Sequence, residues 1–197
     1  MPTRIYLNDV YPYDIPDFKG DEKNIINFDI KNKEDQFWTK QPLPNFEKLT
    51  QKQLMDWIWK EEERRRNGVH FLNNGELTYI NPIHYKFLQY YTGDFSTKTD
   101  KTKRSPDFWD AHRLYCYFLE FSENYEYAVG DITFKPRRRG ITQIHNSNAI
   151  ENVIGNFSCH AGLMSANKKM VKESQFYPIR NCISKYQQYF RPKFKTN

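Results

Sequence analysis

The sequence lacks the features of a disulfide framework, a cysteine zinc site and a membrane span. Its three cysteines, Cys116, Cys159 and Cys182, lie far apart and form no C-x-x-C pair, a usage that is typical of a reducing compartment. The five histidines do not pair with them at metal-ligand spacing. No apolar run approaches the length of a membrane span, and the N-terminus has no apolar signal-peptide core. These absences predict a soluble intracellular protein with no membrane partner.

Aromatic residues and positive charge are plentiful. Phe, Tyr and Trp make up 17% of the 197 residues, and they are expected to supply much of the buried area. The formal net charge is +6 and the isoelectric point is near 9.1. This charge favours a polyanionic partner, although a solvated basic surface would give the same balance.

The first part of the chain divides into an arm and a lead-in region. Residues 1–48 are polar, aromatic and interrupted by prolines, which indicates either an extended arm that docks through its aromatic side chains or a mobile tail. Residues 49–125 have helical and β-hairpin patterns and are rich in aromatic residues. We therefore expect a separate lead-in subdomain there.

Local signals place the elements of the lead-in subdomain. Thr50-x-x-Gln53 is a capping box that opens a helix ending at Gly68. Two β-branched and aromatic runs flank Asn73-Asn74-Gly75-Glu76, which predicts a hairpin with an Asn-Gly turn. Asn81-Pro82 predicts the start of a second helix, and Ser105-Pro106-Asp107 the cap of a third.

Residues 126–197 change to an alternating strand and helix pattern. We expect a strand at 127–134, a helix at 142–154, a second strand at 159–164 and a helix from 167 that Pro178 kinks or restarts. This order predicts an α/β fold and the opening unit of a parallel sheet.

The loop after the first expected strand has the chemistry of a phosphate cradle. It reads Lys135-Pro136-Arg137-Arg138-Arg139-Gly140-Ile141-Thr142 and leads into a helix, whose positive N-terminal end favours anions. Gly140 allows close backbone approach, and the Thr142 hydroxyl is suited to ligate Mg²⁺. Arg137 and Arg138 are suited to stabilise charge on a γ-phosphate. A basic surface turn that touches nucleic-acid phosphates, or has no ligand, is the alternative interpretation.

The loop departs from the standard phosphate-loop pattern G-x-x-x-x-G-K-[ST] at its lysine. Ile141 stands at the usual lysine position, while Lys135 stands at the position of the first glycine. The pattern is therefore K-x-x-R-x-G-x-[ST].

With these motifs, the run from about Gly68 to Phe194 resembles the N-terminal ATPase region of the large terminase subunit of tailed phages, most closely that of crAss-like phages. Some terminases have the same displaced lysine. The segments that carry the resemblance are Asn73-Asn74-Gly75, Thr78-Tyr79-Ile80, His84-Tyr85, Phe108-Trp109, the loop Lys135 to Thr142, Leu163-Met164-Ser165 and Tyr189-Phe190-Arg191-Pro192.

The resemblance implies a P-loop ATPase domain of the RecA-like, or ASCE, class with ATP and Mg²⁺ as cofactors. It implies phosphate-loop roles for Lys135, Arg138, Gly140 and Thr142, with Ile141 in place of the usual lysine, and it puts Asn81, His84 and Tyr85 near the adenine. A packing helix is the alternative for residues 81–85. The implied partners are double-stranded DNA, a portal protein, the small terminase subunit and further copies in a ring, and the implied location is the host cytoplasm during phage assembly.

The sequence shows no counterpart of the remaining catalytic parts of such a subunit. No apolar strand ending in Asp-Glu follows residue 165, and the remaining length holds no acidic nuclease domain. We therefore expect the isolated chain to lack ATPase turnover, as a fragment or one piece of a split gene would.

Other candidates have plainer explanations. Asp107, Asp110 and His112 could suggest acid–base chemistry, but helix capping and surface exposure are the simpler explanation. The lysines 168, 169 and 172 are most simply a solvated helix face, and Cys159-His160 most simply a packed strand.

Overall fold

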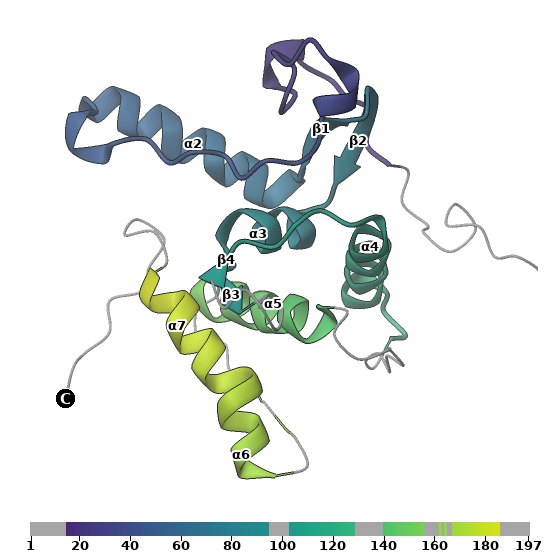
Figure 1. Ribbon diagram of the computed structural model, residues 1–197, viewed down its shortest axis with the longest axis vertical. Helices are drawn as coiled ribbons and strands as arrows, with labels where there is room; N and C mark the ends of the chain where they lie inside the picture. Colours follow the sequence, from purple (N-terminus) through teal and green to yellow (C-terminus); the bar gives the residue numbers. More distant parts are fainter. Residues whose placement is uncertain are drawn as a thin grey trace, which may run out of the picture. The chain divides into compact units, whose positions relative to one another are not determined.

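The computed structural model describes residues 15–94, 103–128, 140–155, 162, 164 and 167–185 (Figure 1). The chain divides into two compact units, and each is described by itself below. Unit 1 comprises Met1–Tyr85 and Asp107–Lys135, and unit 2 comprises Lys86–Pro106 and Pro136–Asn197. Both contain helices, and the described strands form two small antiparallel sheets of two strands each. The expected mixture of helices and strands is confirmed.

Helix α2 (Gln51–Asn67) in unit 1 begins and ends where the sequence predicts. The Thr50 side chain accepts a hydrogen bond from the Gln53 backbone, and the Gln53 side chain accepts one from the Thr50 backbone, which completes the capping box. Gly68 ends the helix with φ 72° and ψ −169°, a conformation that is almost confined to glycine. Its N–H donates to the carbonyl oxygen of Arg64.

Strands β1 (Val69–Asn73) and β2 (Glu76–Ile80) form the predicted antiparallel hairpin in unit 1. Asn74 and Gly75 occupy the turn with φ values of 51° and 83°. Positive φ at both central residues defines the turn type whose twist matches the flanking strands.

The described part of the N-terminal region, residues 15–48, packs on this hairpin. It contains three single 3₁₀ turns, Glu22–Asn24, Lys33–Asp35 and Phe46–Lys48. Ile26 forms a parallel bridge with Phe71 of β1. Trp38 is buried against the edges of Phe71 and Tyr85, whereas Phe28 and Phe37 are 42% and 54% exposed. This region therefore docks on the hairpin through some of its aromatic side chains and not through all of them.

Helices α3 (Pro82–Tyr90) and α4 (Asp110–Asn124) follow the hairpin. The boundary between the units falls within α3, after Tyr85. In unit 1, Tyr117 of α4 donates a hydrogen bond of 2.6 Å to the carbonyl oxygen of Tyr79 in β2. The expected cap of α4 at residues 105–107 is wrong, because Trp109 precedes the first turn and makes no side-chain cap bond.

Unit 2 contains the end of α3, strands β3 (Gly93–Asp94) and β4 (Lys103–Arg104), and helix α5 (Ile141–Gly155). A further helical run consists of α6 (Lys168–Val171), a π-helical turn η4 (Lys172–Phe176) and α7 (Tyr177–Lys185). Helix α7 contacts α5 and β3. Ile144 and Ile150 of α5 are buried as expected, whereas Val153 is 41% exposed.

The two strands expected in residues 126–197 lie mostly outside the described residues. At the start of the first, Tyr127 belongs to a turn and is 74% exposed. Within the second, Gly162 and Met164 have no regular structure, and Met164 is 91% exposed. The part of the chain that the structure describes therefore contains no parallel sheet, and the parallel P-loop sheet stays a prediction.

Candidate nucleotide site

Gly140 and the first turn of α5 form the described part of the predicted phosphate loop. Gly140 has φ 76°, a left-handed backbone conformation that side-chain-bearing residues rarely adopt. Its carbonyl oxygen accepts hydrogen bonds from the N–H groups of Gln143 at 2.8 Å and Ile144 at 3.1 Å. Gly140 is therefore the residue at which the chain turns into the helix.

The backbone at this helix start suits an anion. At a helix start the N–H groups of the first residues, here Ile141 and Thr142, have no acceptor within the helix, and they lie at the positive end of the helix dipole. The side chain of Ile141 is buried, so this residue would present only its backbone N–H to a phosphate. Thr142 is half-buried, which leaves its hydroxyl partly accessible.

Several polar side chains of α5 are buried in unit 2. Asn146 lies one turn after Thr142 and is 2% exposed, and its side chain lies close enough to the Tyr91 phenol to influence its pKa. Burial raises the pKa of the Tyr91 phenol to about 12, so it stays protonated at neutral pH. Ser147 and Glu151 are also buried on this helix. The apolar pattern of this helix does not indicate that these polar positions are buried.

The basic part of the loop lies outside the described residues. This applies to the predicted phosphate ligands Lys135 and Arg138 and to Arg137. Their roles stay predictions from the sequence. Of the residues assigned to the loop, the structure describes Gly140, Ile141 and Thr142, and it brings them together at one helix end.

In unit 1, the predicted adenine-contacting residue Asn81 acts as a helix cap. Its Oδ1 accepts a hydrogen bond of 3.0 Å from the backbone N–H of His84. Its Nδ2 donates to the carbonyl oxygen of Cys116 at 2.9 Å and to Oε2 of Glu120 at 3.0 Å. Asn81 is 0% exposed. These bonds tie the start of α3 to α4 and use both polar ends of the amide.

His84 is also enclosed in unit 1. It is 0% exposed and stacks on Phe108 with ring centroids 5.4 Å apart. Burial, followed by the charges of His112 and Arg113, holds the pKa of His84 well below its usual value of 6.5. The imidazole is therefore neutral in the folded protein at neutral pH.

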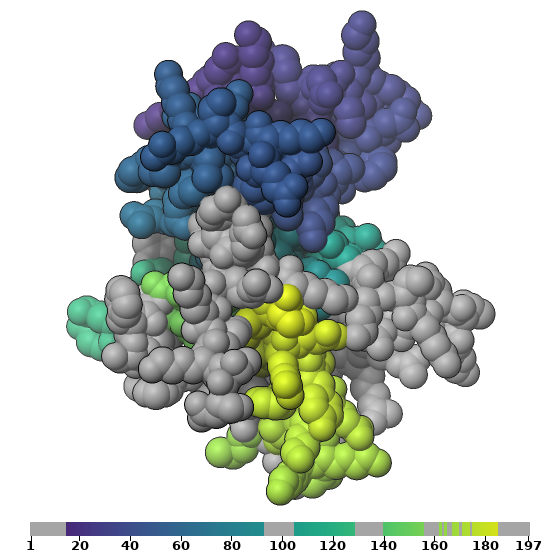
Figure 2. Space-filling view, turned by 90° about the vertical axis from the view of Figure 1, so that its left-hand side faces the viewer, coloured from purple at the N-terminus to yellow at the C-terminus, as the bar shows by residue number. Residues whose placement is uncertain are grey.

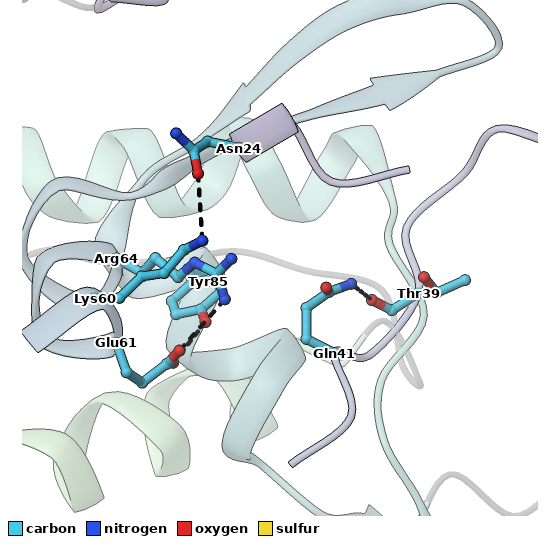
Figure 3. Close-up of polar contacts among 7 residues, drawn as sticks. All are labelled: Asn24, Thr39, Gln41, Lys60, Glu61, Arg64 and Tyr85. Carbon is cyan, nitrogen blue, oxygen red and sulfur yellow. Dashed lines mark hydrogen bonds and ion pairs between the residues drawn. The ribbon is translucent and has the colours of Figure 1, made fainter. Parts of the chain in front are cut away.

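Tyr85 completes a buried polar cluster with α2. Its hydroxyl donates a hydrogen bond of 2.5 Å to Oε1 of Glu61, and Nη1 of Arg64 lies 3.5 Å from Oε2 of the same carboxylate (Figure 3). Glu61 is 3% exposed. Burial and the Glu61 carboxylate raise the pKa of Tyr85 far above its usual value of 10.0. The helical spacing of Glu61 after Leu54, Trp57 and Ile58 was the sequence signal for this inward carboxylate.

These contacts give residues 81–85 a packing role in unit 1. The side chains of Asn81, His84 and Tyr85 are each 0% exposed, so an adenine would reach them only after they became accessible. Adenine contact stays a prediction. Residues 140–142 belong to unit 2, so the two groups of predicted ligands are described separately.

The weaker candidates take structural positions. Asp110 forms an ion pair of 3.0 Å with Arg113 one turn later, and His112 is buried and stacked on Trp109. Arg64 and Arg66 pair with Glu61 and Glu62 of their own helix. Asp107 is exposed, and Cys159 and His160 lie outside the described residues.

Within the described ranges, no three His, Cys, Asp or Glu side chains group in a way that could hold a metal ion. Nor is any helix in those ranges both long and apolar enough to cross a membrane. Comparison of the chain with models of protein families, with curated proteins and with solved structures finds no match.

Proposed function

We propose that this chain binds Mg·ATP at the start of α5 as the N-terminal ATPase part of a DNA-packaging motor, the large terminase subunit of tailed phages. The observation that carries the proposal is the left-handed Gly140 at the first turn of α5, directly after the basic run 135–139. Glycine takes this backbone conformation at the lowest cost, and a helix start of this kind has N–H groups available to phosphate oxygens.

Each loop residue has a distinct role in the proposal. Lys135 folds over the β- and γ-phosphates in place of the lysine that Ile141 replaces, and Thr142 ligates Mg²⁺. Arg137 and Arg138 stabilise the charge that develops on the γ-phosphate during transfer. The N–H groups of residues 140–142 hold the phosphate oxygens. The proposed fold around this loop is a parallel P-loop sheet built from residues 127–134 and 159–164.

In the full-length motor, ATP hydrolysis would drive double-stranded DNA into a procapsid. The proposed partners are this DNA, a portal protein, the small terminase subunit and further copies of the chain in a ring, in the host cytoplasm during assembly. The resemblance supports these partners. What we propose for this chain is ATP binding; turnover also requires carboxylates that activate water and complete the coordination of Mg²⁺.

A phosphate-binding module without nucleotide specificity is the second candidate. The formal charge of +6 and the consecutive arginines 137–139 favour it. Such a module would contact nucleic-acid phosphates electrostatically, and its affinity would fall steeply with salt.

Nucleotide binding separates the two candidates. A fluorescent ATP analogue with Mg²⁺ would be titrated into the wild-type chain and into Lys135→Ala, with the exposed Lys52→Ala of α2 as a control for the loss of one positive charge. We expect Lys135→Ala to abolish binding, because Lys135 is the residue proposed to contact the β- and γ-phosphates in place of the lysine that Ile141 replaces. The Lys52→Ala chain should bind like the wild type.

Unchanged binding in Lys135→Ala would remove Lys135 from the site. Absence of Mg-dependent binding in the wild type, together with salt-sensitive binding of an oligonucleotide, would favour the phosphate-binding module.

A further inference from the structure

The helical run α6–η4–α7 in unit 2 concentrates the positive charge of the chain. Residues 168–185 contain five basic residues and one acidic residue, a net charge of +4 within a chain whose net charge is +6. The basic residues are Lys168, Lys169, Lys172, Arg180 and Lys185, and the acidic residue is Glu173.

The π-helical turn η4 determines which side chains follow one another on this run. The N–H of Tyr177 donates to the carbonyl oxygen of Lys172, five residues earlier, so this turn holds one residue more than an α-helical turn. Lys172 follows Lys168 by four residues. The extra residue then brings Tyr177, instead of Phe176, to the position one turn beyond Lys172. The π turn thus aligns two lysines and a tyrosine.

These side chains line a surface hollow of about 360 Å³, formed by Lys168, Lys169, Lys172, Glu173 and Tyr177. All four charged residues are exposed, and Tyr177 is 52% exposed. Three lysines and one glutamate line the hollow, so it has an excess of positive charge. It is open to solvent, which suits a backbone lying along the surface better than an enclosed small ligand.

The opposite side of α7 is engaged in packing. Cys182 is 1% exposed, and its Sγ lies 3.7 Å from the carbonyl oxygen of Tyr90 within unit 2. The lysine side therefore faces away from the packed side of this run. In Figure 2, the yellow-green and yellow atoms of residues 167–185 form a continuous exposed surface.

Phosphate oxygens are the groups that this arrangement recognises. Lysines act as point charges for phosphates, and phosphate contacts carry no information on base sequence. Their helical spacing lets successive ammonium groups contact neighbouring phosphates, and the exposed ring of Tyr177 offers a flat surface or a hydroxyl to the adjoining sugar.

We propose that Lys168, Lys169, Lys172 and Tyr177 form a contact surface for the phosphodiester backbone of duplex DNA. This inference extends the proposed function by assigning its DNA partner to a surface. It stands on the charge and the π turn of α6–η4–α7, and its test is separate from the nucleotide site.

The test compares two triple variants that lose the same charge. K168Q/K169Q/K172Q removes the lysines of the hollow, and K23Q/K48Q/K52Q removes three exposed lysines of unit 1. Binding of a labelled duplex of arbitrary sequence would be measured by fluorescence anisotropy over a range of salt concentrations. Circular dichroism and thermal melting would confirm that both variants fold.

We expect the hollow variant to weaken binding and to flatten the salt dependence. The slope of log K against log salt changes by about 0.9 for each lost phosphate contact, so three contacts correspond to roughly 2.7. The charge-retaining K168R/K169R/K172R should bind like the wild type. Equal weakening in both glutamine variants would mean a response to net charge alone, and would overturn the proposal.

Two further measurements distinguish duplex binding from single-strand binding, and DNA binding from nucleotide binding. A single-stranded oligonucleotide that binds more tightly than the duplex, and loses that affinity in Tyr177→Ala, would indicate base stacking and overturn the assignment to duplex DNA. Mg·ATP binding would be measured on the same proteins. If Lys135→Ala retains nucleotide binding while the hollow variant loses DNA, the nucleotide proposal fails and the DNA surface stands; the reverse pattern overturns the DNA surface alone.

Discussion

At the residue scale, His84 shows how burial changes the chemistry available to a side chain. A solvent-accessible histidine near a ligand would exchange its proton near neutral pH. His84 is 0% exposed, stacked on Phe108 and close to His112 and Arg113, and its pKa lies well below 6.5. The main consequence of its position is therefore a dependence of stability on acid.

We predict that acid destabilises the protein through His84. Above pH 6.5 the residue is neutral in both states and has no effect on the free energy of unfolding. Below pH 6.5 the unfolded chain binds a proton that the folded protein excludes, so this free energy falls by up to about 1.4 kcal/mol per pH unit. Urea unfolding between pH 8 and pH 5 measures the slope.

The control separates titration from loss of stability. His84→Phe keeps a ring for stacking on Phe108 and removes the titrating group, so its slope should be shallower than that of the wild type. Phe71→Leu lowers the packing of the same unit and retains His84, so it should unfold at lower urea with the wild-type slope. Equal slopes for wild type and His84→Phe would contradict the prediction.

At the element scale, Gly68 connects α2 to β1 in a conformation that admits no side chain. A Cβ at this position would lie 2.3 Å from the carbonyl oxygen of Ile80 and 2.7 Å from the hydroxyl oxygen of Tyr79. That hydroxyl donates a hydrogen bond of 2.7 Å to the carbonyl oxygen of Asn67, which closes the corner between helix and strand. The glycine therefore determines how the hairpin leaves the helix.

Gly68→Ala is expected to lower the free energy of unfolding by about 2–4 kcal/mol. Its positive φ with extended ψ is a glycine-only region that costs about 1–3 kcal/mol, and the contacts with Ile80 and Tyr79 add to this. Chemical denaturation measures the change. Gly20→Ala is the matched control in the same unit, because its nearest neighbour would be Phe18 at an ordinary 3.5 Å. A loss in Gly68→Ala no larger than in Gly20→Ala would contradict the expectation.

Elements with a local cause were predictable from the sequence. The capping box of Thr50 and Gln53 and the Asn-Gly turn of the hairpin are complete within a few residues, and α2, β1 and β2 begin and end close to the predicted positions. The start of α5 at Gly140 was predictable for the same reason.

Features that depend on distant contacts were not predictable. The π turn at residues 172–176 inserts one residue into a helix whose pattern indicated only a kink at Pro178. The burial of Asn81 depends on a carbonyl of α4 that lies 35 residues further along the chain. A pattern of apolar residues records which side of an element is inward, but it does not record the partner of a buried amide.

At the scale of the whole molecule, the chain crosses between its two units three times. Unit 1 combines residues 1–85 with residues 107–135, and unit 2 combines residues 86–106 with residues 136–197. Each unit is thus built from segments that are distant in sequence. Within unit 1, the bond from Tyr117 to the Tyr79 carbonyl joins two such segments, α4 and β2.

From this arrangement we predict that segments of the same unit lose stability together, even where they are distant in sequence. Tyr117→Phe removes the hydroxyl and leaves the buried Tyr79 carbonyl without that donor, so unit 1 should lose about 1–3 kcal/mol. Amide hydrogen exchange should accelerate in α4 and in β1–β2 together, because they open as one cooperative unit, while α7 keeps its wild-type rates. Cys182→Ser in α7 provides the reciprocal case, since it places a polar hydroxyl at a site that is 1% exposed in unit 2. If exchange accelerated evenly over α4, β1–β2 and α7 in both variants, the two units would unfold together. The two compact units would then not be separate units of stability.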